Sequence, residues 1–145
     1  MAYQYVFFDL KHEFSASKKT AYYINNNIEE GANFITTYDV KAQPIIPYTT
    51  KNYKFISLET KKEFTYITWD ESRKAFISYN DVKKCIDERL NDNKPVYLLY
   101  VFGNLADYVL KLEEDYNVEK VFYDYNTYAG VVRESYVIYK IENPK

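Results

Sequence analysis

The chain has 145 residues and a formal net charge of −2 at pH 7, so it is long enough to bury its own core and lacks the basic field that attracts duplex nucleic acid. Its single cysteine, Cys85, excludes an intramolecular disulfide, and its longest apolar run is too short to cross a bilayer. We therefore expect one domain, covering residues 1–145, in a cytoplasmic protein that binds neither membranes nor duplex nucleic acid.

The N-terminal part of the chain predicts a strand followed by a helix. Residues 3–10 are rich in aromatic and β-branched side chains, as strands are. Ser15 or Ser17 can serve as the N-cap of the helix, apolar residues recur at helical spacing, and Gly31 can end it.

The middle of the chain predicts mostly strands. Residues 33–40 have strand composition, and Pro44 and Pro47 then favour an extended connection. Polar residues separate three further runs of strand composition, which predict an antiparallel meander: residues 52–59, 62–69 and 74–79.

The C-terminal half alternates helices with strands. Asn80 or Asp81 can cap a helix that buries Val82, Cys85, Ile86 and Leu90. Residues 96–102 are apolar throughout, which is typical of a strand covered on both faces. The chain then closes with a hairpin of two strands, residues 119–125 and 131–141.

A second helix in this half begins at Asn104. Its spacing predicts a buried stripe made of Leu105, Tyr108, Val109, Leu112 and Tyr116. Its predicted exposed residues are Asp107, Lys111 and Glu114. Together the elements predict an α+β fold: one mixed, largely antiparallel sheet of about six or seven strands, with about three helices.

Three groups of side chains are candidates for chemistry. Asp9, His12 and Glu13 stand at the end of the first predicted strand, where they could bind a divalent metal or transfer protons, or could be solvated surface residues. Cys85 could be a nucleophile paired with His12, although its helical neighbours favour a buried packing role. Pairs of neighbouring lysines could contact phosphate groups, but the acidic residues beside them favour plain solvated surface.

A fourth group points to protein binding. Trp69 and Arg73 lie at a predicted strand end, and such residues, when exposed, anchor interfaces. Tyr125 and Tyr128 in the hairpin loop are further partner-binding candidates. The chain has 18 tyrosines, which reflect AT-rich codon usage, a need for rigid amphipathic contact area, or both.

Residues 80–141 resemble the C-terminal half of the GCN5-related N-acetyltransferases. The order helix, central strand, helix, strand, strand is shared, an Asn-containing loop opens the second helix, and "DYNVEKV" stands where the family has a phrase of the type "LGFEKV". The resemblance implies a related fold and, for active members, acetyl-CoA as the cofactor.

The sequence departs from that family at its most specific motif. The family holds the pyrophosphate of acetyl-CoA with a glycine-containing turn, where bare backbone N–H groups can approach it. The corresponding turn here, "SYNDVKKC", contains no glycine. Alignment also places Glu113 where many members carry their general-acid tyrosine.

These observations favour a binding protein over an enzyme, with no cofactor. The leading prediction is a small module that occupies the surface of another protein, such as a phage or mobile-element accessory protein or inhibitor. One alternative is an acetyltransferase-like protein, catalytic or degenerate. Another is a metal-dependent hydrolase or nuclease that uses Asp9 and Glu13.

Overall fold

The computed structural model describes residues 16–67, 69, 73–74, 76–90, 94–101, 106–124 and 135–143. Its helices are α2 (Ser17–Asn27), α3 (Asp39–Ala42), the 3-10 helix η1 (Gln43–Tyr48), α4 (Tyr79–Leu90) and α5 (Ala106–Asp115). Its strands are β1 (Asn33–Thr36), β2 (Lys54–Ser57), β3 (Val96–Val101), β4 (Asn117–Asp124) and β5 (Tyr136–Glu142). The strand predicted for residues 3–10 lies outside the described residues.

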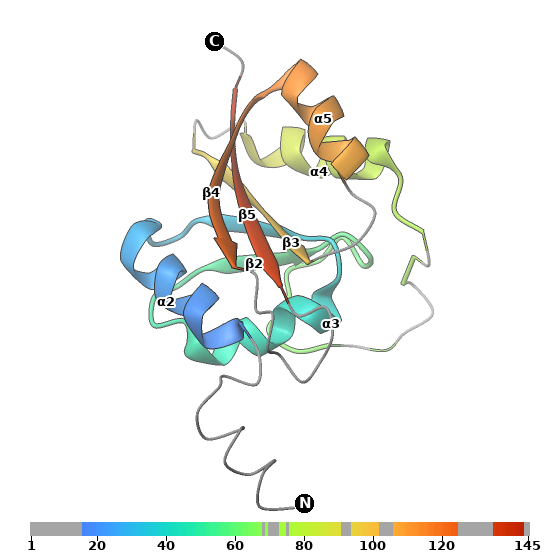
Figure 1. Cartoon of the computed structure of the whole chain (residues 1–145). Coiled ribbons are helices and arrows are strands. Elements are labelled where there is room, and N and C mark those ends of the chain that lie inside the picture. Colours follow the sequence, from blue (N-terminus) through green and yellow to red (C-terminus); the bar gives the residue numbers. More distant parts are fainter. Residues whose placement is uncertain are drawn as a thin grey trace, which may run out of the picture.

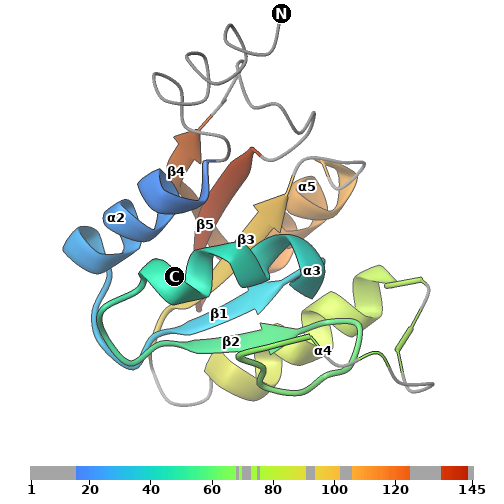
Figure 2. The same cartoon turned by 90° about the horizontal axis from the view of Figure 1, so that it is seen from below.

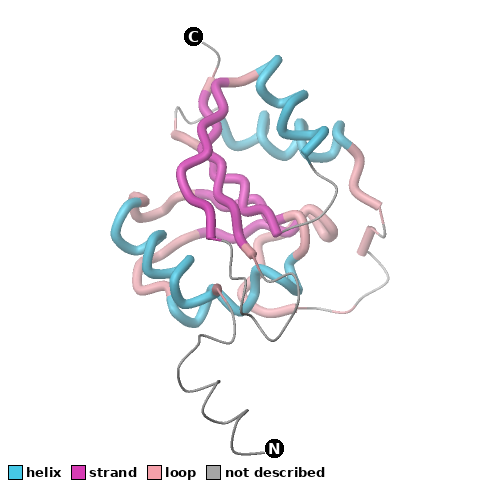
Figure 3. Tube along the Cα trace, in the orientation of Figure 1, coloured by secondary structure: helices cyan, strands magenta, loops and turns pink. Residues whose placement is uncertain are grey.

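The described strands form one mixed sheet (Figures 1 and 3), and their order in it is β2-β1-β3-β5-β4. Strand β1 is parallel to both of its neighbours, β2 and β3, whereas β5 is antiparallel to β3 and β4. The α+β class and the mixed sheet are confirmed. The described part of the chain has five strands and four α-helices rather than the predicted numbers, and half of its strand pairs are parallel.

The parallel β1–β2 pair follows from helical structure that the sequence did not predict. Residues 39–48 form α3 and η1, although a strand end and an extended connection were expected. Pro44 lies in the first turn of η1, where proline is tolerated because the N–H it lacks would have no helical partner. A helical crossover of this kind returns the chain in the same direction and so permits parallel pairing.

The predicted antiparallel meander is wrong for the described residues. Between β2 and α4 they form a single antiparallel bridge, between Ile56 and Glu63. Strand β2 pairs with β1 on one edge, and on its other edge it meets the following described residues only at this bridge. Tyr66 and Phe76 in this segment are mostly exposed, so these residues do not line a sheet face although the segment has strand-like composition.

The core has two layers because side chains on neighbouring strand positions alternate between the two sheet faces. Phe34 packs with α2, α3 and η1 on one face, whereas the next residue, Ile35, packs with α4 and α5 on the other. Figure 2 shows α2 and α3 on one side of β1 and β2 and α4 on the other. The sheet is therefore covered on both faces.

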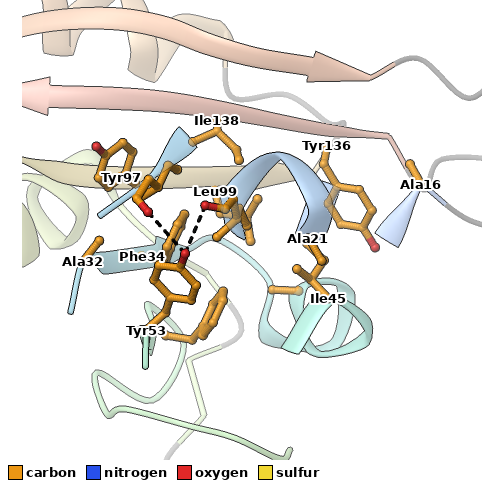
Figure 4. Packing of buried hydrophobic residues seen from close by; sticks show 14 residues of the cluster. Ala16, Ala21, Ala32, Phe34, Ile45, Tyr53, Tyr97, Leu99, Tyr136 and Ile138 are labelled. Atoms are coloured by element: carbon orange, nitrogen blue, oxygen red, sulfur yellow. Dashed lines mark hydrogen bonds between the residues drawn. The ribbon is translucent and has the colours of Figure 1, made fainter. Parts of the chain in front are cut away.

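An aromatic group fills the layer under α2 (Figure 4). The ring of Phe34 lies 5.1 Å from that of Phe55, 5.4 Å from that of Tyr97 and 5.6 Å from that of Tyr53, measured between centroids. The buried Tyr53 hydroxyl donates a hydrogen bond to the backbone carbonyl of Ile24 at 3.0 Å. Some of the unusual tyrosine content is therefore core rather than contact surface.

The helices α2 and α4 begin differently from the prediction. Ala16, not Ser17, is the N-cap of α2, and the Ser17 hydroxyl instead hydrogen-bonds the buried Tyr136 hydroxyl at 3.0 Å. At α4, Ser78 and Asp81 form reciprocal side-chain to backbone hydrogen bonds, both 3.2 Å long. This is a capping box, which satisfies N–H groups that have no helical partner.

The organisation of the C-terminal half is confirmed. The residues of β3 whose side chains are described are all buried, and so are Val109 and Leu112 of α5 and Tyr116, which follows α5. Tyr108, also expected to be buried, is only half-buried. Lys111 and Glu114 are exposed. Strands β4 and β5 form the expected antiparallel pair, whereas Leu105 and the side chain of Asp107 lie outside the described residues.

The helices of the described residues include none that is both long and apolar enough to cross a membrane.

The prediction that Cys85 is buried is confirmed, since only 6% of it is exposed. Burial raises the pKa of its thiol, against the smaller lowering effect of the nearby Arg89. We expect a bulky maleimide to label the native thiol much more slowly than the thiol of the urea-unfolded chain. The reaction requires both that the thiol is deprotonated and that the reagent can reach it. Labelling would be followed by mass spectrometry. Equal rates for the native and the unfolded chain would contradict this placement.

Candidate functional site

A polar cluster lies beyond the carboxyl ends of the parallel strands β1 and β2. Ser57 is the last residue of β2, Glu59 follows two residues later, and Asp39 begins α3 shortly after β1 ends. The carboxyl edge of parallel strands is where open α/β sheets place their ligand sites, because the connecting loops diverge there. The position of the cluster therefore makes it a candidate for a functional site.

Arg73 joins the two carboxylates of the cluster. Its guanidinium donates to both oxygens of Asp39, with Nη2 to Oδ1 at 2.6 Å and Nη1 to Oδ2 at 3.0 Å. The same Nη2 donates to Oε2 of Glu59 at 2.8 Å. Asp39 Oδ2 also accepts from the buried Ser57 hydroxyl at 2.9 Å. The Asp39 pair is bidentate, the geometry that gives Arg–carboxylate contacts both strength and direction.

Two carboxylates that share one guanidinium titrate differently. Burial acts to raise the pKa of Asp39, but hydrogen bonds from Arg73 and Ser57 outweigh it and the pKa is lowered. Burial and the charge of Asp39 raise the pKa of Glu59. Glu59 is therefore the first of the pair to take up a proton as the pH falls.

Trp69 stacks on this cluster. The Arg73 guanidinium carbon lies 4.9 Å from the centroid of the Trp69 ring, a cation–π contact, while 77% of Trp69 is exposed. Tyr38, next to Asp39 in the sequence, and Tyr66 are exposed as well. We call Tyr38, Tyr66 and Trp69 the aromatic surface.

An open pocket of about 450 Å³ lies between Asp39 and Tyr66. Its remaining lining residues are Thr60, Lys62, Glu63, Phe64 and Thr65. Both polar and apolar side chains thus surround it, and it is wide enough to receive a side chain of a partner.

A second pocket, of about 460 Å³, lies by the C-terminal end of α2 and the sheet. Tyr97 donates there to Oε2 of Glu29 at 3.0 Å, and Lys140 pairs with Glu142 at 2.8 Å. Because these polar groups pair with one another, the pocket offers a partner fewer available side chains than the aromatic surface does.

The structure brings two of the predicted site residues together, Trp69 and Arg73. Of the pair, Trp69 is exposed as an interface anchor would be, whereas the Arg73 side chain is mostly buried. The other candidates, Asp9, His12, Glu13, Tyr125 and Tyr128, lie outside the described residues. Among the described residues, no group of three or more His, Cys, Asp or Glu side chains is arranged to hold a metal ion.

Sequence reasoning missed the two carboxylates. Asp39 was assigned to a strand, and Glu59 to a strand of the meander. They lie 20 positions apart and 34 and 14 positions from Arg73. Only the parallel pairing of β1 with β2 brings them together, so no local motif could have identified the cluster.

The turn that starts α4 carries an acidic side chain where the resemblance would place a pyrophosphate. Asp81 accepts from Ser78 and pairs with Lys74 at 2.8 Å and Lys61 at 2.9 Å. Hydrogen bonds from the two lysines lower the pKa of Asp81 far below its usual range, so it is an anion at neutral pH. An anion at a helix N-terminus competes directly with a bound phosphate.

Comparison with protein families, with curated proteins and with solved structures found no match.

Proposed function

We propose that the protein is a binding module whose aromatic surface, centred on Trp69, contacts another protein. The observation that carries this proposal is the exposure of a tryptophan stacked on a mostly buried, ion-paired arginine. Tryptophan, tyrosine and arginine are enriched at the energetic centres of interfaces. An indole that stays exposed to water does not gain the free energy that its burial in an interface would supply.

The hydrogen bonds among Asp39, Glu59 and Arg73 support a structural role for these side chains rather than acid–base catalysis. Both oxygens of Asp39 already accept hydrogen bonds from Arg73, and Oε2 of Glu59 accepts from Arg73 and from the backbone N–H of Asp39 at 3.3 Å. A general base needs an acceptor directed at its substrate. Here the carboxylates are directed at Arg73.

In its more specific form, the proposal is a cytoplasmic accessory protein or inhibitor of a phage or mobile element. Such a protein acts by covering a surface that its target needs. The support is the tyrosine-rich composition together with the aromatic surface. The pocket beside Tyr66 would receive one side chain of the target.

We expect Trp69→Ala to weaken partner binding about 30-fold or more, the loss expected when an interface hot spot is truncated. The full-length chain, immobilised, would be incubated with a lysate of the source cells, and retained proteins would be identified and titrated. Tyr22→Ala is the matched control, because Tyr22 is 72% exposed on α2. Equal retention by the Trp69→Ala variant, or no retained protein, would contradict the proposal.

An acetyltransferase-like protein is the second candidate, favoured by the order α4, β3, α5, β4, β5 along residues 79–142. We expect no heat of binding when acetyl-CoA is titrated into the protein, because the α4 turn lacks glycine and Asp81 occupies its N-terminus. Calorimetric binding in the micromolar range would instead favour this candidate.

A further inference from the structure

We propose that Arg73, clamped by Asp39 and Glu59, is a positioning residue that holds the indole of Trp69 in one orientation. The use of this orientation for binding rests on the proposed function. The positioning itself is a property of the free protein.

The clamp is anchored in the body of the fold. Asp39 begins α3 and is only 2% exposed, and Ser57, which donates to it, is the buried last residue of β2. The backbone N–H of Lys74 also donates to the carbonyl of Glu59 at 2.9 Å. The guanidinium plane is thus fixed by charge-assisted hydrogen bonds to α3 and to the turn that follows β2.

Trp69 depends on this plane for its orientation. With 77% of its surface in water, the indole gains little from burial. A planar guanidinium at 4.9 Å provides a stacking surface that an ammonium group does not. A side chain ordered before binding avoids part of the entropy cost of association, so this arrangement would favour a tight complex.

The clamp should also survive mild acid. Among the residues that the structure describes, the charged groups around it are Asp39 and Glu59 on the guanidinium itself, Lys62 and Glu63 on the pocket wall, and Lys61 and Lys74, which pair with Asp81. Protonation of Glu59 removes one of two negative charges and leaves the neutral Asp39–Arg73 pair intact. The indole therefore loses its platform only when Asp39 is protonated.

The test uses Trp69 as the reporter, since it is the single tryptophan of the chain. Time-resolved fluorescence anisotropy and acrylamide quenching would be measured on the full chain, excited where tyrosine does not absorb. We expect Arg73→Gln to shift the ratio of stacked to unstacked indole about two- to fivefold, as for an exposed cation–π contact. The change appears as added nanosecond motion and faster quenching.

Two further variants separate positioning from general damage. Arg73→Lys keeps the charge but not the planar fork, so it should also release the indole. Lys83→Gln removes a lysine from an unrelated ion pair with Asp115 and should leave Trp69 unchanged. Circular dichroism identifies variants that remain folded.

The proposal is overturned if folded Arg73→Gln and Arg73→Lys both leave the indole as ordered as in the wild type. It is equally overturned if the wild-type anisotropy falls between pH 7 and about 4.5 while the fold is retained. If the variants release the indole but no partner is ever captured, the positioning stands and the proposed binding function fails.

Discussion

Replacement of Leu112 by alanine should lower the free energy of unfolding by about 2 to 5 kcal/mol. Leu112 is fully buried on α5 and packs in the layer that contains Ile86, Leu98 and Ile141. The substitution removes apolar atoms from that layer and leaves a cavity that the rigid sheet cannot fully close. Urea denaturation followed by circular dichroism measures the loss.

Leu110 on the same helix provides the matched control. It is 62% exposed, so Leu110→Ala should change the free energy of unfolding by no more than about 0.5 kcal/mol. Lys111→Ala, also exposed, should be tolerated equally well. If Leu112→Ala left stability unchanged but abolished partner binding, the stripe of α5 would be a recognition surface and its packing on the sheet would be wrong.

The two carboxylates of the Arg73 cluster should differ in how much stability is lost when each is neutralised. Asp39→Asn should cost about 3 kcal/mol, the lower end of the range for breaking a buried ion pair, because Glu59 still partners Arg73. Glu59→Gln should change stability by less than about 1 kcal/mol or increase it, since it removes the repulsion from Asp39 and keeps an oxygen acceptor for Arg73. Paired urea denaturation at pH 7 measures both.

The pH dependence of these two variants follows from the signs of the pKa shifts. The pKa of Asp39 is lowered in the folded state, so its contribution is complete above its ordinary value of 3.8 and is lost as the pH falls through the folded value. The pKa of Glu59 is raised, so its ionisation opposes folding, and protonation relieves that cost as the pH falls toward 4.5.

The Asp39→Asn deficit should therefore persist from pH 7 to about 4 and shrink below it. The difference between wild type and Glu59→Gln should shrink over the higher range, from neutral pH down to about 4.5. Identical pH profiles for the two variants would mean that the carboxylates do not divide their roles as the structure indicates.

The helices and strands of the C-terminal half were determined by the sequence itself. Val82, Cys85 and Ile86 recur at helical spacing and are buried on α4, and the apolar run of β3 is covered on both faces. Local periodicity records which face of an element is buried, because burial of apolar surface is the dominant favourable term in folding.

Strand partners and the ion cluster were decided only by the tertiary structure. Periodicity does not state which strands pair or in which direction, so residues 52–79 matched a meander, whereas in the structure β2 pairs in parallel with β1 and meets the following described residues only at one bridge. The meeting of Asp39 with Arg73 across 34 positions depends on that pairing. A charged side chain shows no preference in the sequence for a distant partner, because their attraction acts only after the backbone has brought them within a few ångströms of each other.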